Sequence, residues 1–229
     1  VTARVSPFPD PPLLQCVNAM FTPGVTASKA AMERRMKDAR SALDEGLALT
    51  ARGDLLQADD ALEQACQLLE APYSKEPRSI SGDPLENQLL STCLSSRAQC
   101  ILDMSEGKGK LPDGTPFVSQ FEEEDHFQYF RRQATKQAEE CAEKACLVHT
   151  DGLNLFRLGL ARQQMAIQKA EGPESWLRED ENIDVMKDAG RCLLKATKAG
   201  GAPHAEQRLK EVRAWLLERK VTSVFPEYV

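Results

Sequence analysis

Residues 39–69 read ARSALDEGLALTARGDLLQADDALEQACQLL, and this stretch decides the expected fold. Its apolar and small residues recur at helical spacing in two short segments, which are separated by a tight turn at Gly53 and Asp54. Gly46 is a small residue at which a first helix can approach its partner closely, and Ala58 has the same role in the second helix. The second helix continues at steps of four, three and three with Leu62, Ala65 and Leu68. The stretch therefore predicts a helix–turn–helix unit held together by close helix contacts.

The same spacing recurs twice further along the chain. A helix expected over 85–104 and another over 122–149 form a second pair, in which the second-helix steps are repeated by Ala138, Ala142, Ala145 and Val148. In a third pair the first helix carries Leu155, Leu158, Gly159 and Arg162. Its second helix, expected over 183–198, carries Ala189, Leu193, Ala196 and Ala199. A last helix over 203–220 has the charged outer face of a terminal cap. We predict an all-α fold of three helix–turn–helix repeats and a C-terminal capping helix.

The chain divides into three parts on this interpretation. Residues 1–28 are expected to be an extended arm, because they contain Pro7, Pro9, Pro11, Pro12 and Pro23. Residues 29–220 form the helical domain, with insertions at about 105–126 and 171–182, and residues 221–229 form a tail.

Composition narrows the classes of function. The net charge of −6 argues against a nucleic-acid partner, since phosphate neutralisation needs clustered Lys and Arg. No apolar run approaches the roughly 20 residues that span a bilayer. The seven Cys form no compact disulfide framework, which indicates a reducing compartment such as cytoplasm, organelle matrix or stroma. The first residue is Val1 and not Met, which is compatible with a removed N-terminal targeting peptide.

The repeated units resemble the tetratricopeptide repeat (TPR) family over about residues 29–220, and they are most similar to the TPR domains of large immunophilins and other co-chaperones. The segments that carry the resemblance are ALDEGLALTARGDLLQADDALEQA, LSSRAQCIL, QAEECAEKAC and LNLFRLGLARQQM. The resemblance implies a short superhelix whose first helices line a concave surface that binds protein segments. It implies no catalytic residue, no cofactor and no metal.

Many relatives of this kind hold an acidic chaperone tail with a clamp of Lys, Asn, Asn, Lys and Arg on the first helices. Carried over position by position, the first-repeat Lys and Asn fall on Leu43 and Leu47, and the second-repeat Asn falls on Ser96. The third-repeat Lys falls on Leu153, and only the Arg is retained, as Arg157. One Arg cannot neutralise two carboxylates and leucines supply no donors, so clamp function is not expected.

These positions predict instead an apolar partner-binding groove that suits an amphipathic helix or an extended apolar segment. Its residues are Leu43, Leu47, Ser96, Leu153, Phe156, Arg157 and Leu160. Two other interpretations stay open. In the first, these groove residues pack between repeats and are not exposed. In the second, the chain's own N-terminal arm fills the groove through Phe8, Leu13, Leu14, Val17 and Phe21.

The first insertion is a second candidate for partner specificity, because Phe117, Phe121 and Phe127 lie beside acidic residues in an otherwise aromatic-poor chain. The alternative is that this loop folds back over the second repeat.

Sites for chemistry are weak in this sequence. Cys146 and His149 share a helix face, but Cys141 points elsewhere and no fourth ligand is evident, so a zinc site is not expected.

We predict a non-catalytic interaction scaffold that is an accessory subunit of a larger complex. The alternatives are a co-chaperone or assembly factor that binds transiently, or the interaction half of an enzyme such as a prolyl isomerase, whose catalytic domain would have to lie upstream.

Overall fold

The computed structural model describes residues 13–70, 83–171 and 179–221, with side chains from residue 29 onward. Within these ranges the chain forms seven α-helices and one 3-10 helix, and the extended pairing described there is an isolated bridge between Lys110 and Pro116. The elements are α1 (Leu13–Arg52), α2 (Leu55–Glu70), α3 (Pro84–Ser105), η2 (Phe117–Gln120), α4 (Glu124–Val148), α5 (Gly152–Glu171), α6 (Glu179–Ala199) and α7 (Ala205–Glu218). The predicted all-α class is confirmed. None of the described helices has the length and apolarity needed to cross a membrane.

Helix ends coincide with turn and capping residues in the sequence. Gly53 ends α1 in a left-handed conformation (φ +84°), and its N–H donates to the carbonyl of Thr50 over 3.0 Å. Asp83 caps α3 by accepting a hydrogen bond from the Leu85 N–H at 2.8 Å, with Pro84 in the first helical position. The Asp83 and Pro84 signals explain why the expected and observed starts of α3 agree within one residue.

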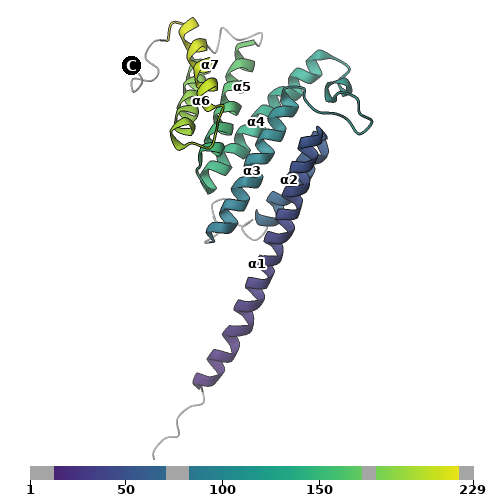
Figure 1. Cartoon of the computed structure of the whole chain (residues 1–229), viewed down its shortest axis with the longest axis vertical. Helices are drawn as coiled ribbons and strands as arrows, with labels where there is room; N and C mark the ends of the chain where they lie inside the picture. The colour runs from purple at the N-terminus through teal and green to yellow at the C-terminus, as the bar shows by residue number, and fades with distance from the viewer. Residues whose placement is uncertain (1–12, 71–82, 172–178, 222–229) are drawn as a thin grey trace, which may run out of the picture.

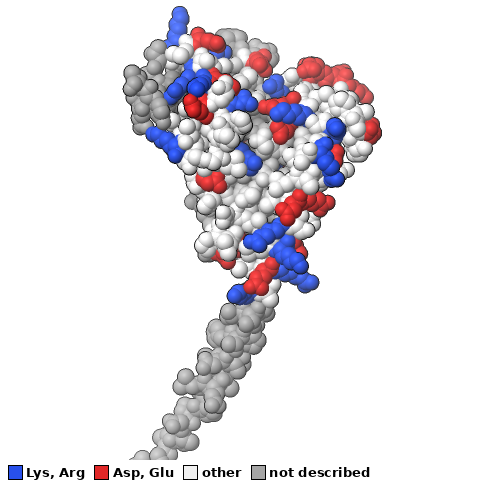
Figure 2. Space-filling model, viewed as in Figure 1, with Lys and Arg blue, Asp and Glu red and all other residues white. Residues whose placement is uncertain are grey.

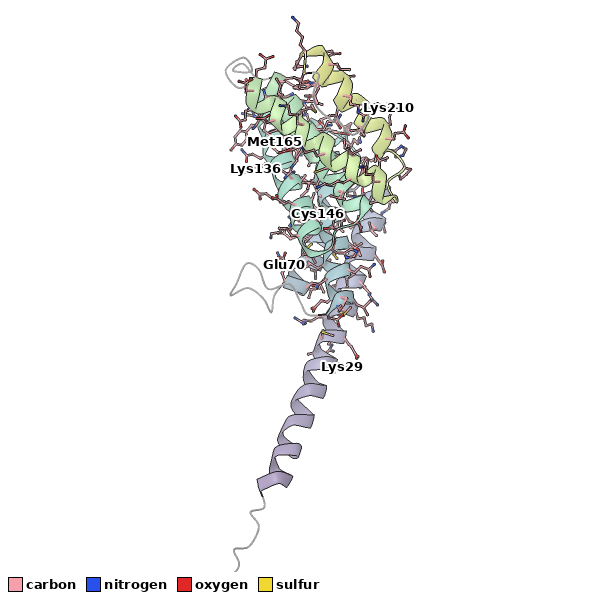
Figure 3. All side chains as sticks on the ribbon, turned by 90° about the vertical axis from the view of Figure 1, so that its left-hand side faces the viewer. Lys29, Glu70, Lys136, Cys146, Met165 and Lys210 are labelled. Atoms are coloured by element: carbon pink, nitrogen blue, oxygen red, sulfur yellow. The ribbon has the colours of Figure 1, made fainter. Side chains whose placement is uncertain are left out.

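The start of α1 is a correction. Residues 13–28 were expected to be extended, but α1 begins at Leu13 and continues through Pro23. The physical reason is that most of the prolines precede the helix, and that apolar residues then recur at the helical steps of three and four. The first half of α1 extends beyond the other helices in two perpendicular views (Figures 1 and 3). The backbone of residues 13–21 thus lies away from α3 and α5. This position contradicts the interpretation that the chain's own arm fills the groove. Phe8, which also belongs to that interpretation, lies outside the described residues.

The helices pack as consecutive neighbours. The second half of α1 packs on α2, α3 packs on α4, α5 packs on α6, and α7 covers α6 (Figure 1). Between the pairs, α2 contacts α3 and α4 contacts α5. The first helices of the pairs also contact one another, α1 with α3 and α3 with α5, so they share one side of the molecule.

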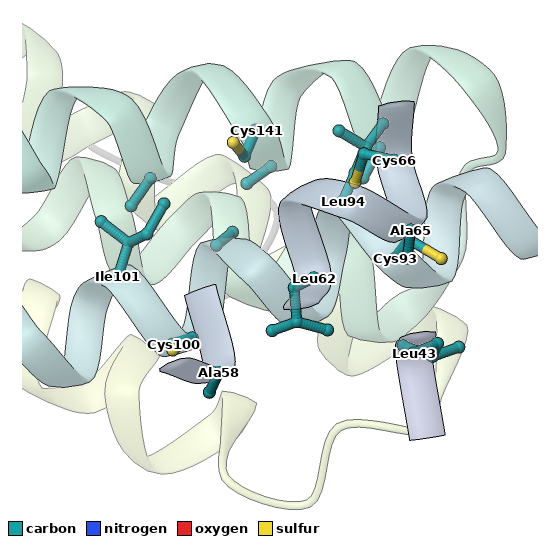
Figure 4. Close-up of a cluster of buried hydrophobic side chains, with 14 of the residues drawn as sticks. Leu43, Ala58, Leu62, Ala65, Cys66, Cys93, Leu94, Cys100, Ile101 and Cys141 are labelled. Carbon is teal, nitrogen blue, oxygen red and sulfur yellow. The ribbon is translucent and has the colours of Figure 1, made fainter. Parts of the chain in front are cut away.

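Small residues set the distance between helices within a pair. A Cβ built on Gly46 would lie 2.7 Å from Cγ of Leu62, and one built on Gly159 would lie 2.8 Å from Cγ of Leu193. The predicted close approach is confirmed at both positions. Alanines at the repeated second-helix positions, such as Ala58 and Ala138, have no exposed surface. Figure 4 shows part of this core, where leucines lie beside small residues and thiols.

Candidate partner-binding surface

The predicted groove residues lie on α1, α3 and α5, but they do not share one environment. Leu43 is 7% exposed and Ser96 is 8% exposed, so both are buried. For these two residues the structure agrees with packing between helices and corrects the prediction that they line an open groove. The reason is that α3 contacts both α1 and α5, which places these side chains between helices rather than on a free face.

Two predicted leucines do reach the surface. Leu47 on α1 is 44% exposed and Leu153 on α5 is 39% exposed. Phe156 and Leu160 are half-buried, and each packs against a different core cluster. The apolar part of the surface is therefore two separate exposed leucines with partly covered neighbours.

Arg157 is a polar member of the predicted groove, and it lies one helical turn after Leu153 on α5. The Arg157 guanidinium donates to the Ser95 hydroxyl over 2.8 Å, which joins α5 to α3. Burial lowers the pKa of the Arg157 guanidinium to about 10, while Asp151 and Asp103 oppose this shift through their charges. A guanidinium has five N–H donors, and the Ser95 hydroxyl takes one bond, so donors remain for an acceptor on a partner.

A short series of polar contacts continues this edge toward the C-terminal end of α3. Asp103 accepts from the Lys108 ammonium at 3.0 Å and from the Gln99 amide at 3.3 Å. Gln164 on α5 donates to Glu106 at 2.9 Å, which ties α5 to the end of α3. The sequence prediction missed Ser95, Asp103 and Gln164. The available signal was the step of four from Gln99 to Asp103 on the helix that also carries Ser95.

The phenylalanines of the first insertion pack inward. Phe117 has no exposed surface, and its ring lies 5.4 Å from the ring of Phe130 on α4. Phe121 and Phe127 are half-buried, with ring centroids 5.3 Å apart. These contacts correct the prediction for Phe117, whose side chain is not available to a partner, and they match the interpretation of a loop that folds back.

One backbone hydrogen bond attaches the same insertion to the first helix pair, and another closes the insertion on itself. The Lys110 N–H donates to the Gly53 carbonyl at 2.8 Å, and the Phe117 N–H donates to the Gly109 carbonyl at 3.0 Å. The insertion therefore links the α1–α2 turn to the second pair. Its surface keeps an acidic patch formed by Glu122, Glu123, Glu124 and Asp125, all exposed. Elsewhere on the face shown in Figure 2, basic and acidic side chains are interspersed.

Two arginines join neighbouring pairs by ion pairs with carboxylates one helical turn apart. Arg97 on α3 contacts Asp59 at 2.9 Å and Glu63 at 3.2 Å on α2. Arg162 on α5 contacts Glu139 at 2.9 Å and Glu143 at 3.3 Å on α4. The same device is thus used at both junctions between pairs.

The cysteines are mainly core residues. Cys66, Cys93, Cys100, Cys141 and Cys192 are buried and Cys146 is half-buried. Burial raises the pKa of Cys93 to about 12 and that of Cys146 to about 11, so these thiols are protonated at neutral pH. Among the described residues no group of three or more His, Cys, Asp or Glu side chains is placed to hold a metal ion.

Comparison with known proteins gives no relative: no protein-family model, no curated protein and no solved structure matches this chain.

Proposed function

We propose that this chain is a non-catalytic interaction scaffold of the tetratricopeptide type, and that it acts as an accessory subunit of a larger protein complex. The observation that carries the proposal is the recurrence of one helix contact. Gly46 meets Leu62 and the Ala58 carbonyl in the first pair, and Gly159 meets Leu193 and the Ala189 carbonyl in the third. Recurring helix pairs of this kind build elongated surfaces that bind other proteins.

The surface that we assign to the partner is the shared side of α1, α3 and α5. Leu47 and Leu153 offer exposed apolar contacts at its two outer helices, and Arg157 on α5 offers hydrogen-bond donors beside Ser95 of α3. A partner segment that places apolar residues on the leucines and a carbonyl or carboxylate near Arg157 would match this chemistry.

A transient co-chaperone or assembly-factor adaptor is the second candidate, favoured by the retained Arg157. It is ranked second because the positions of the other clamp residues hold Leu43, Leu47, Ser96 and Leu153, of which Leu43 and Ser96 are buried. A binder that relies on charge would lose its partner at high salt, whereas an accessory subunit held by apolar contacts would keep it.

The test is affinity purification of the tagged chain from its native cells, with washes at about 0.15 M and 1 M NaCl. The Debye length is about 8 Å at the first concentration and about 3 Å at the second. An accessory subunit retains the same stoichiometric partners after both washes, and an adaptor loses them in the second. Leu47→Asp and Leu153→Asp should each release the partners. Leu217→Asp is the matched control, because Leu217 is 61% exposed on α7 and lies outside the proposed surface. Full partner retention by both surface variants would exclude this surface.

A further inference from the structure

Two serines of this chain stand three residues before an acidic residue. Ser41 precedes Asp44 and Ser119 precedes Glu122, and in both cases a second Glu follows directly. Protein kinases that select acidic substrates recognise carboxylates at such positions with Lys and Arg side chains of their substrate groove. Because the spacing is the same at both serines, only their structural surroundings can distinguish them as kinase substrates.

The fold protects Ser41. This serine is exposed, but it lies in the packed half of α1, where the neighbouring Ala39, Ala42 and Leu43 are buried. A kinase groove holds several residues of its substrate in an extended conformation. Extending the backbone around Ser41 would break the helix and bring the three buried side chains into water, which is unfavourable.

The surroundings of Ser119 are different. Ser119 lies outside the α-helices, in the four-residue 3-10 helix η2. Its side chain is exposed, and so are the side chains of Val118 and Gln120 on either side. The backbone that follows is already extended at Phe121 (φ −96°, ψ 117°) and at Glu123 (φ −126°, ψ 144°), before α4 begins. Ser119 and its acidic residues therefore already have part of the conformation that a kinase groove requires.

The carboxylates that follow Ser119 are also available to a basic groove. Residues 122–125 are Glu, Glu, Glu and Asp, and all four are exposed. Figure 2 shows acidic side chains gathered at the end of the molecule that carries the insertion. Among the described residues this stretch forms one ion pair, between Glu123 and His126 at 3.8 Å, and none with Lys or Arg. A kinase would therefore not have to displace an internal Lys or Arg.

We propose that Ser119 is a phosphorylation site for a protein kinase that selects acidic substrates, with Glu122 as the main recognition residue. In the transfer, Oγ of Ser119 attacks the γ-phosphorus of Mg–ATP and forms a new P–O bond. The bond from this phosphorus to the oxygen that bridges to the β-phosphate breaks, and ADP leaves with the electron pair. The hydroxyl proton passes to the catalytic Asp of the kinase.

Phosphorylation would change both hydrogen bonding and charge in the insertion. The Ser119 hydroxyl donates to the Pro116 carbonyl at 2.6 Å, and the ester oxygen of a phosphoserine has no proton for this bond. The phosphate also adds about −1.5 to −2 charges beside four carboxylates. The same insertion is tied to the first helix pair by the bond from the Lys110 N–H to the Gly53 carbonyl. The modification therefore places new negative charge at the link between the first two pairs.

The test is phosphorylation of the folded full chain by casein kinase 2, a kinase that selects acidic substrates, with Mg–ATP. Intact-mass spectrometry should show one added phosphate of about 80 Da, and peptide mapping should place it on Ser119. Ser119→Ala should remove it. Glu122→Gln should slow the reaction about tenfold or more, because it removes a charge-assisted contact. Asp44→Asn is the matched control and should leave the rate unchanged, and circular dichroism checks that each variant is folded.

Synthetic peptides of residues 37–48 and 115–126 serve as unfolded references. The kinase should phosphorylate both peptides, whereas in the folded chain it should modify Ser119 and spare Ser41. Phe121 packs on Phe117 with ring centroids 5.7 Å apart, so Ser119 should react more slowly in the folded chain than in its peptide. A folded chain without phosphate on Ser119 overturns the proposal, and so does equal phosphorylation of Ser41. Neither result depends on the partner surface at Leu47 and Leu153.

Discussion

Gly159 lies so close to Leu193 that a Cβ built on the glycine would be 2.8 Å from Cγ of the leucine and 3.3 Å from the Ala189 carbonyl oxygen. The same contact joins Gly46 to Leu62 in the first pair. Real Cβ contacts are longer, so a side chain at either position must displace the facing leucine or push the two helices of its pair apart.

Gly159→Ala is therefore expected to destabilise the chain, although alanine is the better helix former. Overpacking costs about 1–3 kcal/mol, and the gain in helix propensity returns at most about 1 kcal/mol. Urea denaturation should show a net loss for Gly159→Ala and a similar loss for Gly46→Ala. Ser41→Ala, at an exposed position of α1, is the control and should change little. A more stable Gly159→Ala variant would contradict the close approach.

The ion pairs at Arg97 should contribute measurably to stability. The Arg97 side chain is 12% exposed and contacts Asp59 and Glu63 on the preceding pair. Arg97→Met leaves two carboxylates without their donor, and a hydrogen bond to a charged group contributes about 1.5–3 kcal/mol. Lys210→Met breaks the exposed pair with Glu206 and should cost less than about 1 kcal/mol. Equal effects of the two substitutions would show that the junction between pairs does not depend on Arg97.

The sequence predicts where the helices of this fold begin and end better than it predicts which elements pack against them. The α3 helix was expected over 85–104 and is found over Pro84–Ser105, because Asp83, Pro84 and the glycine at 107 act locally. Spacing also identifies Gly159 as the small residue of a pair whose two helices are separated by an insertion, and the structure shows that it meets Leu193. These predictions succeed because they depend on residues within one helix or one repeated unit.

The candidate surface depends on contacts between units, and there the sequence is less informative. The sequence predicts Ser96 in a groove and Phe117 at a partner surface, but Ser96 is buried and Phe117 lies in the core. The bond from Arg157 to Ser95 joins residues 62 positions apart. Helical periodicity tells which residues share a face, but it does not tell which element covers that face.

A buried polar network should hold the α4–α5 connection. The Asn154 amide donates to the Ser91 hydroxyl and to the His149 carbonyl, each at 2.7 Å, and the Ser91 hydroxyl lies 3.0 Å from the Ala145 carbonyl. Asn154→Ala removes both amide hydrogen bonds and leaves the buried Ser91 hydroxyl oxygen without its donor, at a cost of about 1–3 kcal/mol. Hydrogen exchange should show faster exchange at the C-terminal end of α4, while the exposed Thr92→Ala control leaves it unchanged. Unaltered protection in Asn154→Ala would show that the network does not hold this connection.

Stability should fall in alkaline solution because of the buried thiols. The ordinary pKa of 9.0 is raised by burial to about 12 for Cys93 and Cys100 and to about 11 for Cys146. Above pH 9 the unfolded chain loses protons that the folded chain keeps. Each such thiol therefore lowers the free energy of unfolding by about 1.4 kcal/mol per pH unit until its folded pKa is reached. Urea denaturation between pH 7.5 and 10.5 should show this decline, with no loss below pH 8 from this cause. Cys93→Ala should make the decline shallower even though it lowers stability at pH 7.5. An identical slope in Cys93→Ala and wild type would show that this thiol ionises equally in both states.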